Sequence, residues 1–225
     1  MYRTFTKGLI AVALLAGPMA AQATSVYWTD WTSVAGNQLS ASGTMGGVGV
    51  TVSSTVAMNG VSQTGSGTNY WIEPNASDKP YTGGSVSNAP TASEQVGLST
   101  ANTVTVTFSS PVSMLYMALL SVGQNGLPVT YDFNQPFVID SEGQGYWGND
   151  ATNGVTGPND TLTMREFHGL LRFTSPVTSL TFTTSPNEYW HAFTFGTPVP
   201  LPAAAWLLLS GLAGLGFVGR RRQAV

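Results

Sequence analysis

Apolar and polar residues alternate with a period of two in many stretches between Val26 and Phe195. No stretch there shows the periodicity of an amphipathic helix. The clearest alternation is in residues 48–52, 103–108, 129–133, 180–183 and 193–195. Such strands are typical of antiparallel sheets with one face in solvent, and clusters of Gly, Asn, Pro and Ser separate them. The pattern predicts an all-β fold, a single antiparallel β-sandwich with a jelly-roll-like arrangement.

A weak internal repeat supports this prediction. Residues 108–115 read Phe-Ser-Ser-Pro-Val-Ser-Met-Leu, and residues 173–180 read Phe-Thr-Ser-Pro-Val-Thr-Ser-Leu. In each segment one strand ends at Phe, and a second begins after the proline, which has no N–H to donate to a sheet. We therefore expect two equivalent corners of one sandwich rather than two duplicated domains.

The first 23 residues predict a secretory signal peptide with a short helix. A basic segment, an apolar run over 8–16 and a helix-breaking Gly-Pro pair precede Ala21 and Ala23, the small residues that a signal peptidase reads. The apolar run is too short to span a bilayer. We expect cleavage after Ala23, so that the mature protein begins at Thr24.

The other end of the chain predicts a transmembrane helix. Residues 203–219 contain no charge, and Arg220, Arg221 and Arg222 follow. As a helix this run would be about 25 Å long, slightly less than a hydrocarbon core of about 30 Å, and snorkelling arginines or local thinning would let it span. The arginines should stay in the cytoplasm, which places the preceding domain outside it. The alternative is a buried core helix with a basic cap.

A short proline-rich segment, Val199, Pro200, Leu201 and Pro202, precedes the apolar run. Together with the glycine-containing apolar helix and the terminal arginines, it resembles the PEP-CTERM sorting signal in its VPLPA variant, although the commoner form has Glu in place of Leu201. The resemblance covers residues 199–225. It implies processing by an exosortase, a membrane-embedded protease of Gram-negative bacteria that make exopolysaccharide and biofilm matrix. The alternative is a rigid linker to a permanent membrane anchor.

Three parts follow: a signal peptide (1–23), a β-sandwich surface domain (24–197) and a sorting tail (198–225). Residues 103–196 also resemble domains of PEP-CTERM surface proteins, a likeness that carries no assigned activity. The resemblance implies export, anchoring in the inner membrane during processing, and then release to the cell surface or matrix. The expected partners are a signal peptidase, an exosortase, the membrane and exopolysaccharide.

Charge and cysteine content exclude several function classes. The predicted domain contains eleven acidic and three basic residues, a net charge of −8, whereas the whole chain carries −3. Such a domain repels phosphate backbones, which disfavours nucleic-acid binding. The chain has no cysteine, which excludes disulfides, thiol catalysis and thiolate metal sites.

Candidate catalytic and metal-binding residues are scattered. His168 and His191 lack the spaced partners of a zinc site, so no metal or other cofactor is expected. A glycosidase needs two facing carboxylates, which could come from Glu94, Asp140, Glu142, Asp150, Asp160 and Glu166. We predict that the protein is not an enzyme. A polysaccharide-active enzyme on a jelly-roll scaffold is the alternative, and a carboxylate pair in a groove would favour it.

Two loops are rich in oxygen ligands, residues 140–145 and 149–160. Ca²⁺ takes six to eight such oxygens, but these loops do not follow the EF-hand spacing. We therefore expect ordinary Asx turns, with Ca²⁺ binding as the alternative.

Aromatic residues are frequent and often adjacent, as in the pairs Tyr27 and Trp28, Tyr70 and Trp71, Tyr146 and Trp147, and Tyr189 and Trp190. Neighbours on a strand point to opposite faces, which exposes one ring of each pair, although most rings should lie in the core. Exposed rings stack on sugars. We therefore expect a non-enzymatic surface or matrix protein that contacts exopolysaccharide. A structural protein that self-associates through sheet edges is a further alternative.

Overall fold

The computed structural model of the chain describes residues 23–58, 61–147 and 154–200. These residues form fifteen strands and no helix, so no helix in this part of the chain is long and apolar enough to cross a membrane. The all-β prediction is confirmed. The predicted signal peptide up to residue 22, Leu201, Pro202, the apolar run and the arginines lie outside the described residues.

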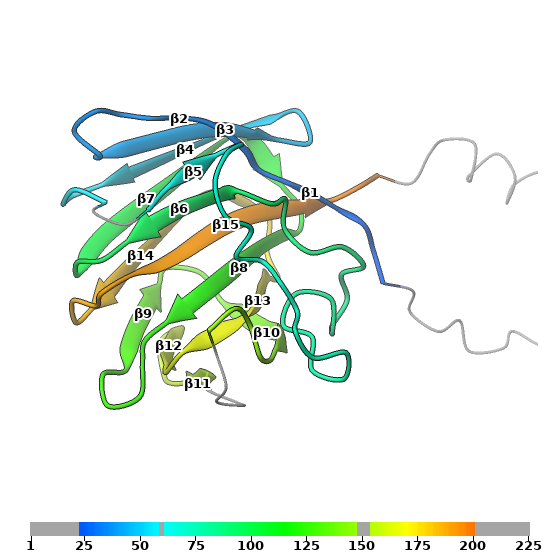
Figure 1. The fold of residues 1–225 in the computed structure, drawn as a ribbon. Helices are drawn as coiled ribbons and strands as arrows, with labels where there is room; N and C mark the ends of the chain where they lie inside the picture. Colours follow the sequence, from blue (N-terminus) through cyan, green and yellow to red (C-terminus); the bar gives the residue numbers. More distant parts are fainter. Residues whose placement is uncertain (1–22, 59–60, 148–153, 201–225) are drawn as a thin grey trace, which may run out of the picture.

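The strands form two antiparallel sheets (Figure 1). The seven-stranded sheet has the order β10 (Phe137–Glu142), β13 (Phe167–Phe173), β8 (Leu115–Val122), β15 (His191–Pro198), β6 (Glu94–Leu98) and β5 (Gln63–Thr64), and β1 (Val26–Trp28) also pairs with β15. The eight-stranded sheet has the order β11 (Gly154–Thr156), β12 (Thr161–Met164), β9 (Val129–Phe133), β14 (Val177–Ser185), β7 (Asn102–Val112), β4 (Val48–Ser54), β3 (Ser40–Met45) and β2 (Asp30–Val34).

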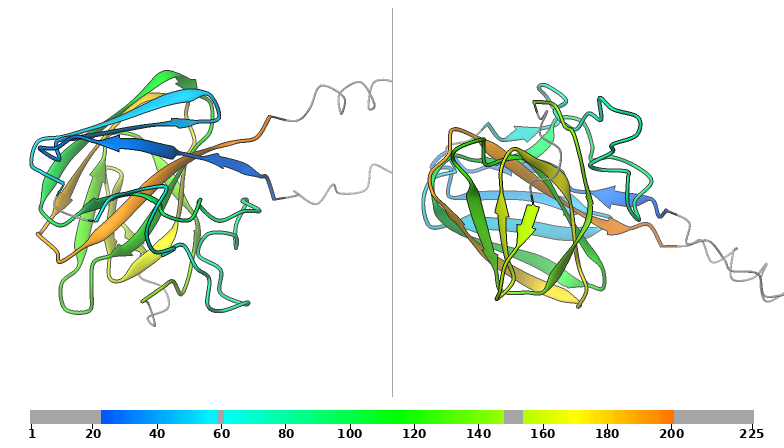
Figure 2. Two further views of the ribbon diagram at one scale, coloured as in Figure 1. Left: turned by 45° about the horizontal axis from the view of Figure 1, so that its top comes forward. Right: turned by 90° about the horizontal axis from the view of Figure 1, so that it is seen from below.

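The two sheets face one another as a sandwich, with one large apolar core between them (Figure 2). In β7 the alternation places Val104, Val106 and Phe108 in this core and leaves the threonines between them on the outside. Aromatic rings join the layers: Phe182 of β14 packs edge-on against Phe193 of β15, with ring centroids 5.6 Å apart. Burial of these side chains supplies the main driving force for the fold.

The central strands of the seven-stranded sheet are buried on both faces. All eight residues of β8 are buried. The connection from residue 65 to 93, which we call the covering segment, lies over the outer face (Figure 2). Its side chains form a second apolar cluster there. That cluster joins Trp71, Tyr81 and Val86 of the covering segment to Val26, Trp28, Tyr116, Ala118, Leu120, Leu170 and Ala192.

The repeated segments lie at corners where the chain passes between the sheets, from β7 to β8 and from β13 to β14. The corners are adjacent, because Leu115 pairs with Phe173 and Val112 pairs with Val177. The repeat thus reflects two matching corners within one sandwich.

The two ends of the described chain lie side by side (Figure 1). Val26 pairs with Pro198, and the Val199 N–H donates to the carbonyl of Ser25 at 2.8 Å. The Thr24 N–H donates to the Ser85 carbonyl, also at 2.8 Å. The first residues after the predicted cleavage point and the first residue of the proline-rich segment are therefore held together at one corner.

Candidate functional site

A pocket of about 380 Å³ opens at the end of the sandwich where β8 ends and β15 begins. This volume is within the usual range for ligand pockets, roughly 300–1,000 Å³. Its lining comes from loops and strand ends far apart in sequence: Val61, Tyr70, Ser121, Gln124, Trp147, Glu166, Glu188, Tyr189 and Trp190. Only the folded sandwich brings these residues together.

Four rings form an aromatic wall, which we define as Tyr70, Tyr146, Trp147 and Trp190. Tyr70 stacks on Trp147 with centroids 4.9 Å apart and planes 26° apart, and Trp190 lies 5.1 Å from Trp147. Tyr146 packs edge-on against Trp147 at 4.6 Å. Trp147 is 44% exposed, and the neighbouring Tyr189 is 93% exposed. The wall therefore presents aromatic surface to solvent.

The sequence analysis expected one ring of each adjacent aromatic pair to be exposed. In three pairs one ring is clearly the more buried: Trp28 beside Tyr27, Trp71 beside Tyr70, and Trp190 beside Tyr189. In the fourth pair both Tyr146 and Trp147 are exposed, because they follow β10 in a bend rather than lie on a strand. That departure from alternation supplies two of the four rings of the wall.

Glu188 is a buried carboxylate on the pocket lining, with only 8% of its surface exposed. Its Oε2 accepts hydrogen bonds from the Gly123 N–H at 2.9 Å and from Nδ1 of His191 at 2.8 Å. Gly123 has a φ of 74°, and any Cβ there would lie 2.1 Å from the carbonyl oxygen of Met164. Oε1 of Glu188 has no hydrogen-bond partner among the described residues.

Glu166 is the second carboxylate on the lining. Its Oε1 accepts a short hydrogen bond from the Ser121 hydroxyl and lies 3.5 Å from Nε2 of the buried His168. Burial by itself would raise the pKa of Glu166, but the close approach of His168 and the hydrogen bond from Ser121 outweigh it and lower that pKa. Glu166 is therefore ionised at neutral pH.

The backbone is strained where these groups meet. Ser121 and Glu166 both have a φ of 53°, in the left-handed region that costs a non-glycine residue about 1 kcal/mol or more. The strain coincides with an irregular register between β13 and β8, between Phe167 and Gly169. Strain of this kind is concentrated at binding and catalytic sites, which supports this end of the sandwich as the functional one.

Of the six acids considered for a carboxylate pair, only Glu166 lines this pocket. Glu94 instead accepts a hydrogen bond from the Trp31 N–H at 2.7 Å, and burial raises its pKa. Burial also raises the pKa of Glu142. Asp160 lines a separate hollow beside β10, and Asp150 lies outside the described residues. Sequence reasoning missed Glu188, although the run Glu-Tyr-Trp-His, an acid followed by two large rings and a histidine, was a usable signal.

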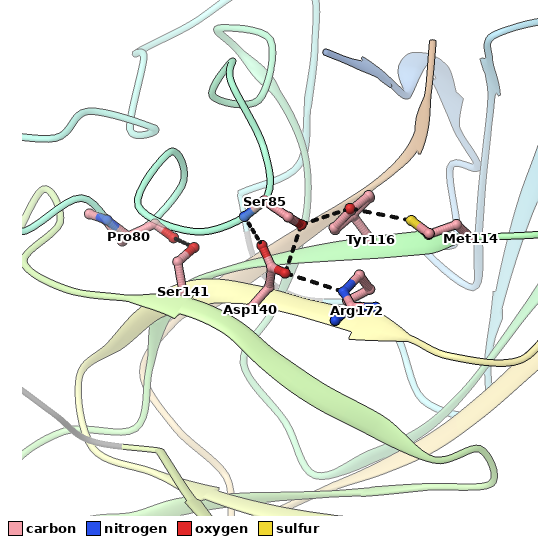
Figure 3. Close-up of polar contacts among 7 residues, drawn as sticks. All are labelled: Pro80, Ser85, Met114, Tyr116, Asp140, Ser141 and Arg172. Carbon is pink, nitrogen blue, oxygen red and sulfur yellow. Dashed lines mark hydrogen bonds and ion pairs between the residues drawn. The ribbon is translucent and has the colours of Figure 1, made fainter. Parts of the chain in front are cut away.

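Asp140, one of the residues offered to Ca²⁺, fixes the covering segment to the sheet (Figure 3). Its carboxylate accepts hydrogen bonds from the N–H and hydroxyl of Ser85, both at 2.8 Å, and from Nε of Arg172 at 3.2 Å. Beside it, the Ser141 hydroxyl donates to the Pro80 carbonyl at 2.7 Å. Within the described ranges, no group of three or more His, Asp or Glu is placed to hold a metal ion.

No known protein family, curated protein or solved structure matches this chain. The argument for function therefore rests on the site. An aromatic wall beside two carboxylates can stack on an apolar ligand face and accept hydrogen bonds from its donors. Acid catalysis would need one carboxyl to stay protonated, and the lowered pKa of Glu166 does not suit that role.

Proposed function

We propose that the chain is an exported, non-enzymatic cell-surface or matrix protein whose sandwich binds exopolysaccharide in the pocket. The observation that carries this proposal is the aromatic wall, a group of rings partly open to solvent around a ligand-sized pocket. Sugar rings have apolar C–H faces edged by hydroxyl groups. Exposed rings match the faces, while Glu166, Glu188 and Gln124 match the hydroxyls.

The geometry of β15 supports the surface location. Its first residue, His191, adjoins the pocket, and its last residue, Pro198, lies at the corner where both ends of the described chain meet. Strands rise about 3.3 Å per residue, so the pocket and that corner are roughly 25 Å apart. A chain held in the membrane through its C-terminal tail would present the pocket away from that membrane.

Export and sorting complete the proposal. They comprise cleavage after Ala23, a membrane-spanning helix over 203–219, exosortase recognition of Val199–Pro202 and a jelly-roll topology for the sandwich. The structure adds a relevant fact, because the Val199 N–H is hydrogen-bonded to Ser25 while Pro200 carries no donor. The last strand of the sheet, β15, thus runs up to the start of the proposed motif.

Glycan-array binding of the full-length chain, purified in mild detergent, tests the glycan-binding function. Trp147→Ala should lower affinity about two- to tenfold, because one aromatic contact contributes about 0.5–1.5 kcal/mol. Tyr27→Ala is the matched control, since Tyr27 is 45% exposed and does not line the pocket. Binding that is equally strong in both variants would contradict the proposal.

Mass spectrometry of the protein from its native host tests the sorting function. We expect an N-terminus at Thr24 and a C-terminus that lacks Arg220–Arg222. Deletion of Val199–Pro202 should leave the full-length tail in the inner membrane, whereas neutral replacements of the three arginines should disturb membrane orientation. Recovery of the intact arginine-containing end from the cell surface would instead show a permanent anchor.

A polysaccharide-active enzyme is the second candidate, because Glu166 and Glu188 line the same pocket. Incubation with each glycan that binds, followed by measurement of newly formed reducing ends, separates the two functions. We expect no release. Release that is abolished by both Glu166→Gln and Glu188→Gln would establish the enzyme instead.

A further inference from the structure

We propose that the pocket selects a positively charged amino sugar, with its ring against the aromatic wall and its ammonium group at the carboxylates of Glu166 and Glu188. This inference names a ligand class for the glycan-binding function and rests on that function. It goes beyond a general affinity for polysaccharide, because it predicts which glycans the pocket rejects.

The free oxygen of Glu188 is the first argument. The Glu188 side chain is only 3% exposed, yet Oε1 has no hydrogen-bond partner among the described residues. This oxygen is not among the fully buried side-chain atoms that lack a partner, so it is open to the pocket and available to a ligand. An ammonium group offers three donors together with the opposite charge, so it would satisfy this oxygen better than a sugar hydroxyl does.

The charges around the pocket are the second argument. Among the residues that the structure describes, no lysine or arginine lines it. Arg165, next to Glu166 in sequence, is exposed and takes part in none of the ion pairs of the described residues. The predicted domain carries a net charge of −8. A uronate or sulfated sugar would thus be repelled, while a cationic sugar would be attracted.

The rings are the third argument. Cations are attracted to the electron-rich faces of Trp and Tyr rings. Tyr70, Trp147 and Trp190 lie within about 5 Å of one another on the same wall, and Tyr189 adds an exposed ring at the rim. A neutral sugar gains only the stacking, whereas an amino sugar gains the stacking and the attraction of the cation.

Hydrogen bonds hold the two carboxylates in place before any ligand arrives. Gly123 and His191 bind one oxygen of Glu188, while Ser121 and His168 approach one oxygen of Glu166. In each residue the second oxygen is left to a ligand. Such preorganisation lowers the entropic cost of binding.

Isothermal titration of the full-length chain in detergent tests the inference. The probes are a glucosamine tetrasaccharide, its fully N-acetylated counterpart and a tetrasaccharide of galacturonic acid, at about pH 6, where the amino groups are protonated. We expect the glucosamine probe to bind at least tenfold more tightly than the N-acetylated probe. The galacturonic acid probe should not bind, and added salt should reduce the preference.

Glu188→Gln and Glu166→Gln are the informative variants, because they remove charge at nearly constant volume. Each should reduce the preference for the glucosamine probe at least threefold and leave affinity for the N-acetylated probe within twofold. Asp132→Asn is the matched control, since Asp132 lies exposed on β9 and is absent from the pocket lining. If Glu188→Gln fails to fold, Glu166→Gln carries the test.

The outcomes separate this inference from the function on which it rests. Equal binding of the glucosamine and N-acetylated probes, or a stronger response to the latter, overturns the charge selection and leaves glycan binding intact. An equal loss of preference in Asp132→Asn would also overturn it, because the effect would then come from overall charge. Failure of all three probes and of every arrayed glycan would overturn the glycan-binding function itself.

Discussion

The outer face of one sheet is open to solvent, whereas the outer face of the other is covered by a segment of the chain. On the eight-stranded sheet, threonines of β7 and β14 face outward, and the hydroxyls of Thr105 and Thr181 lie 3.2 Å apart across the strands. On the seven-stranded sheet the covering segment buries the outer face completely along β8. The outer face of the eight-stranded sheet tolerates water because its own side chains are polar. Burial of the outer face of the seven-stranded sheet depends instead on the covering segment, which contains no strand of either sheet.

Apolar packing and polar contacts, rather than sheet pairing, hold the covering segment. Glu73 organises it internally by accepting hydrogen bonds from the backbone N–H groups of Tyr81 and Thr82, at 2.8 and 2.7 Å. Asp140 attaches it to the sheet through Ser85. The comparison therefore indicates that the outer face of the seven-stranded sheet stays dry through apolar packing that two carboxylates, those of Glu73 and Asp140, help to hold in place.

The largest expected difference concerns apolar burial on the two outer faces. Leu120→Ala should lower the free energy of unfolding by about 2–5 kcal/mol, because Leu120 is fully buried under the covering segment. Thr105→Ala, on the outer face of the other sheet, should change it by less than about 0.5 kcal/mol. Urea denaturation followed by tryptophan fluorescence measures both, and similar costs would show that the two faces are equivalent.

The next effect tests the attachment of the covering segment. Asp140→Ala should cost about 1–3 kcal/mol, because the Ser85 N–H and hydroxyl lose their acceptor and the partly exposed Arg172 loses its partner. Hydrogen exchange should quicken in residues 65–93 while β7 and β14 stay protected. Asp132→Ala is the control. Equal exchange rates in the covering segment of both variants would count against its attachment through Asp140.

A smaller effect should appear in the pH dependence of stability. The pKa of Glu166 is lowered in the folded state. The ionised carboxylate therefore stabilises the fold above the unfolded pKa, and this stabilisation is lost as the pH falls through the folded pKa. The pKa of Glu94 is raised in the folded state, so Glu94 affects stability in the opposite direction. Above the unfolded pKa its charged form destabilises the fold, and protonation at low pH removes this destabilisation.

Urea midpoints between about pH 3 and pH 7 test these signs. Glu166→Gln should lower the midpoint near pH 7, and its difference from the unsubstituted chain should shrink as pH falls. Glu94→Gln should raise the midpoint near pH 7 and have less effect at low pH. If both variants shifted the midpoint near pH 7 in the same direction, the opposite pKa shifts of Glu166 and Glu94 would be contradicted.

The smallest effect on stability is expected at the rim of the pocket. Tyr189→Ala should change the free energy of unfolding by less than about 0.5 kcal/mol, because Tyr189 is 93% exposed. It should still weaken glycan binding, measured by titration with the glycan bound by the unsubstituted chain. A stability loss as large as that of Leu120→Ala would mean that the ring is packed rather than exposed.

How much of the fold could be read from the sequence differs between the sheets. The alternation of valine and threonine in β7 predicts a strand with one wet face, which is what the eight-stranded sheet has. The run Leu-Tyr-Met-Ala-Leu-Leu-Ser-Val of β8 does not alternate, because both of its faces are covered. Nothing periodic marks the covering segment, since its position depends on contacts with residues more than fifty positions away, such as Asp140.

The candidate site was only partly predictable for a similar reason. The adjacent aromatic pairs in the sequence pointed to Tyr70, Trp147 and Trp190 as candidate sugar-binding rings, because one ring of each pair was expected to be exposed. The role of Glu188 depends on the N–H of Gly123, 65 residues away, and on the burial that several loops supply. Isolated acids in a sequence do not reveal such an environment.

The position of β15 has a mechanical consequence. This strand is hydrogen-bonded to β8 on one side and to β6 and β1 on the other. Because those bonds run perpendicular to the strand, a pull along it from Pro198 loads many of them at once, whereas a pull at a hairpin would break them one after another. The pocket lies at the opposite end of the same strand. If the pocket holds a glycan and the tail an anchor, as proposed, a pull between them would stretch the sandwich along a strand that is hydrogen-bonded on both sides.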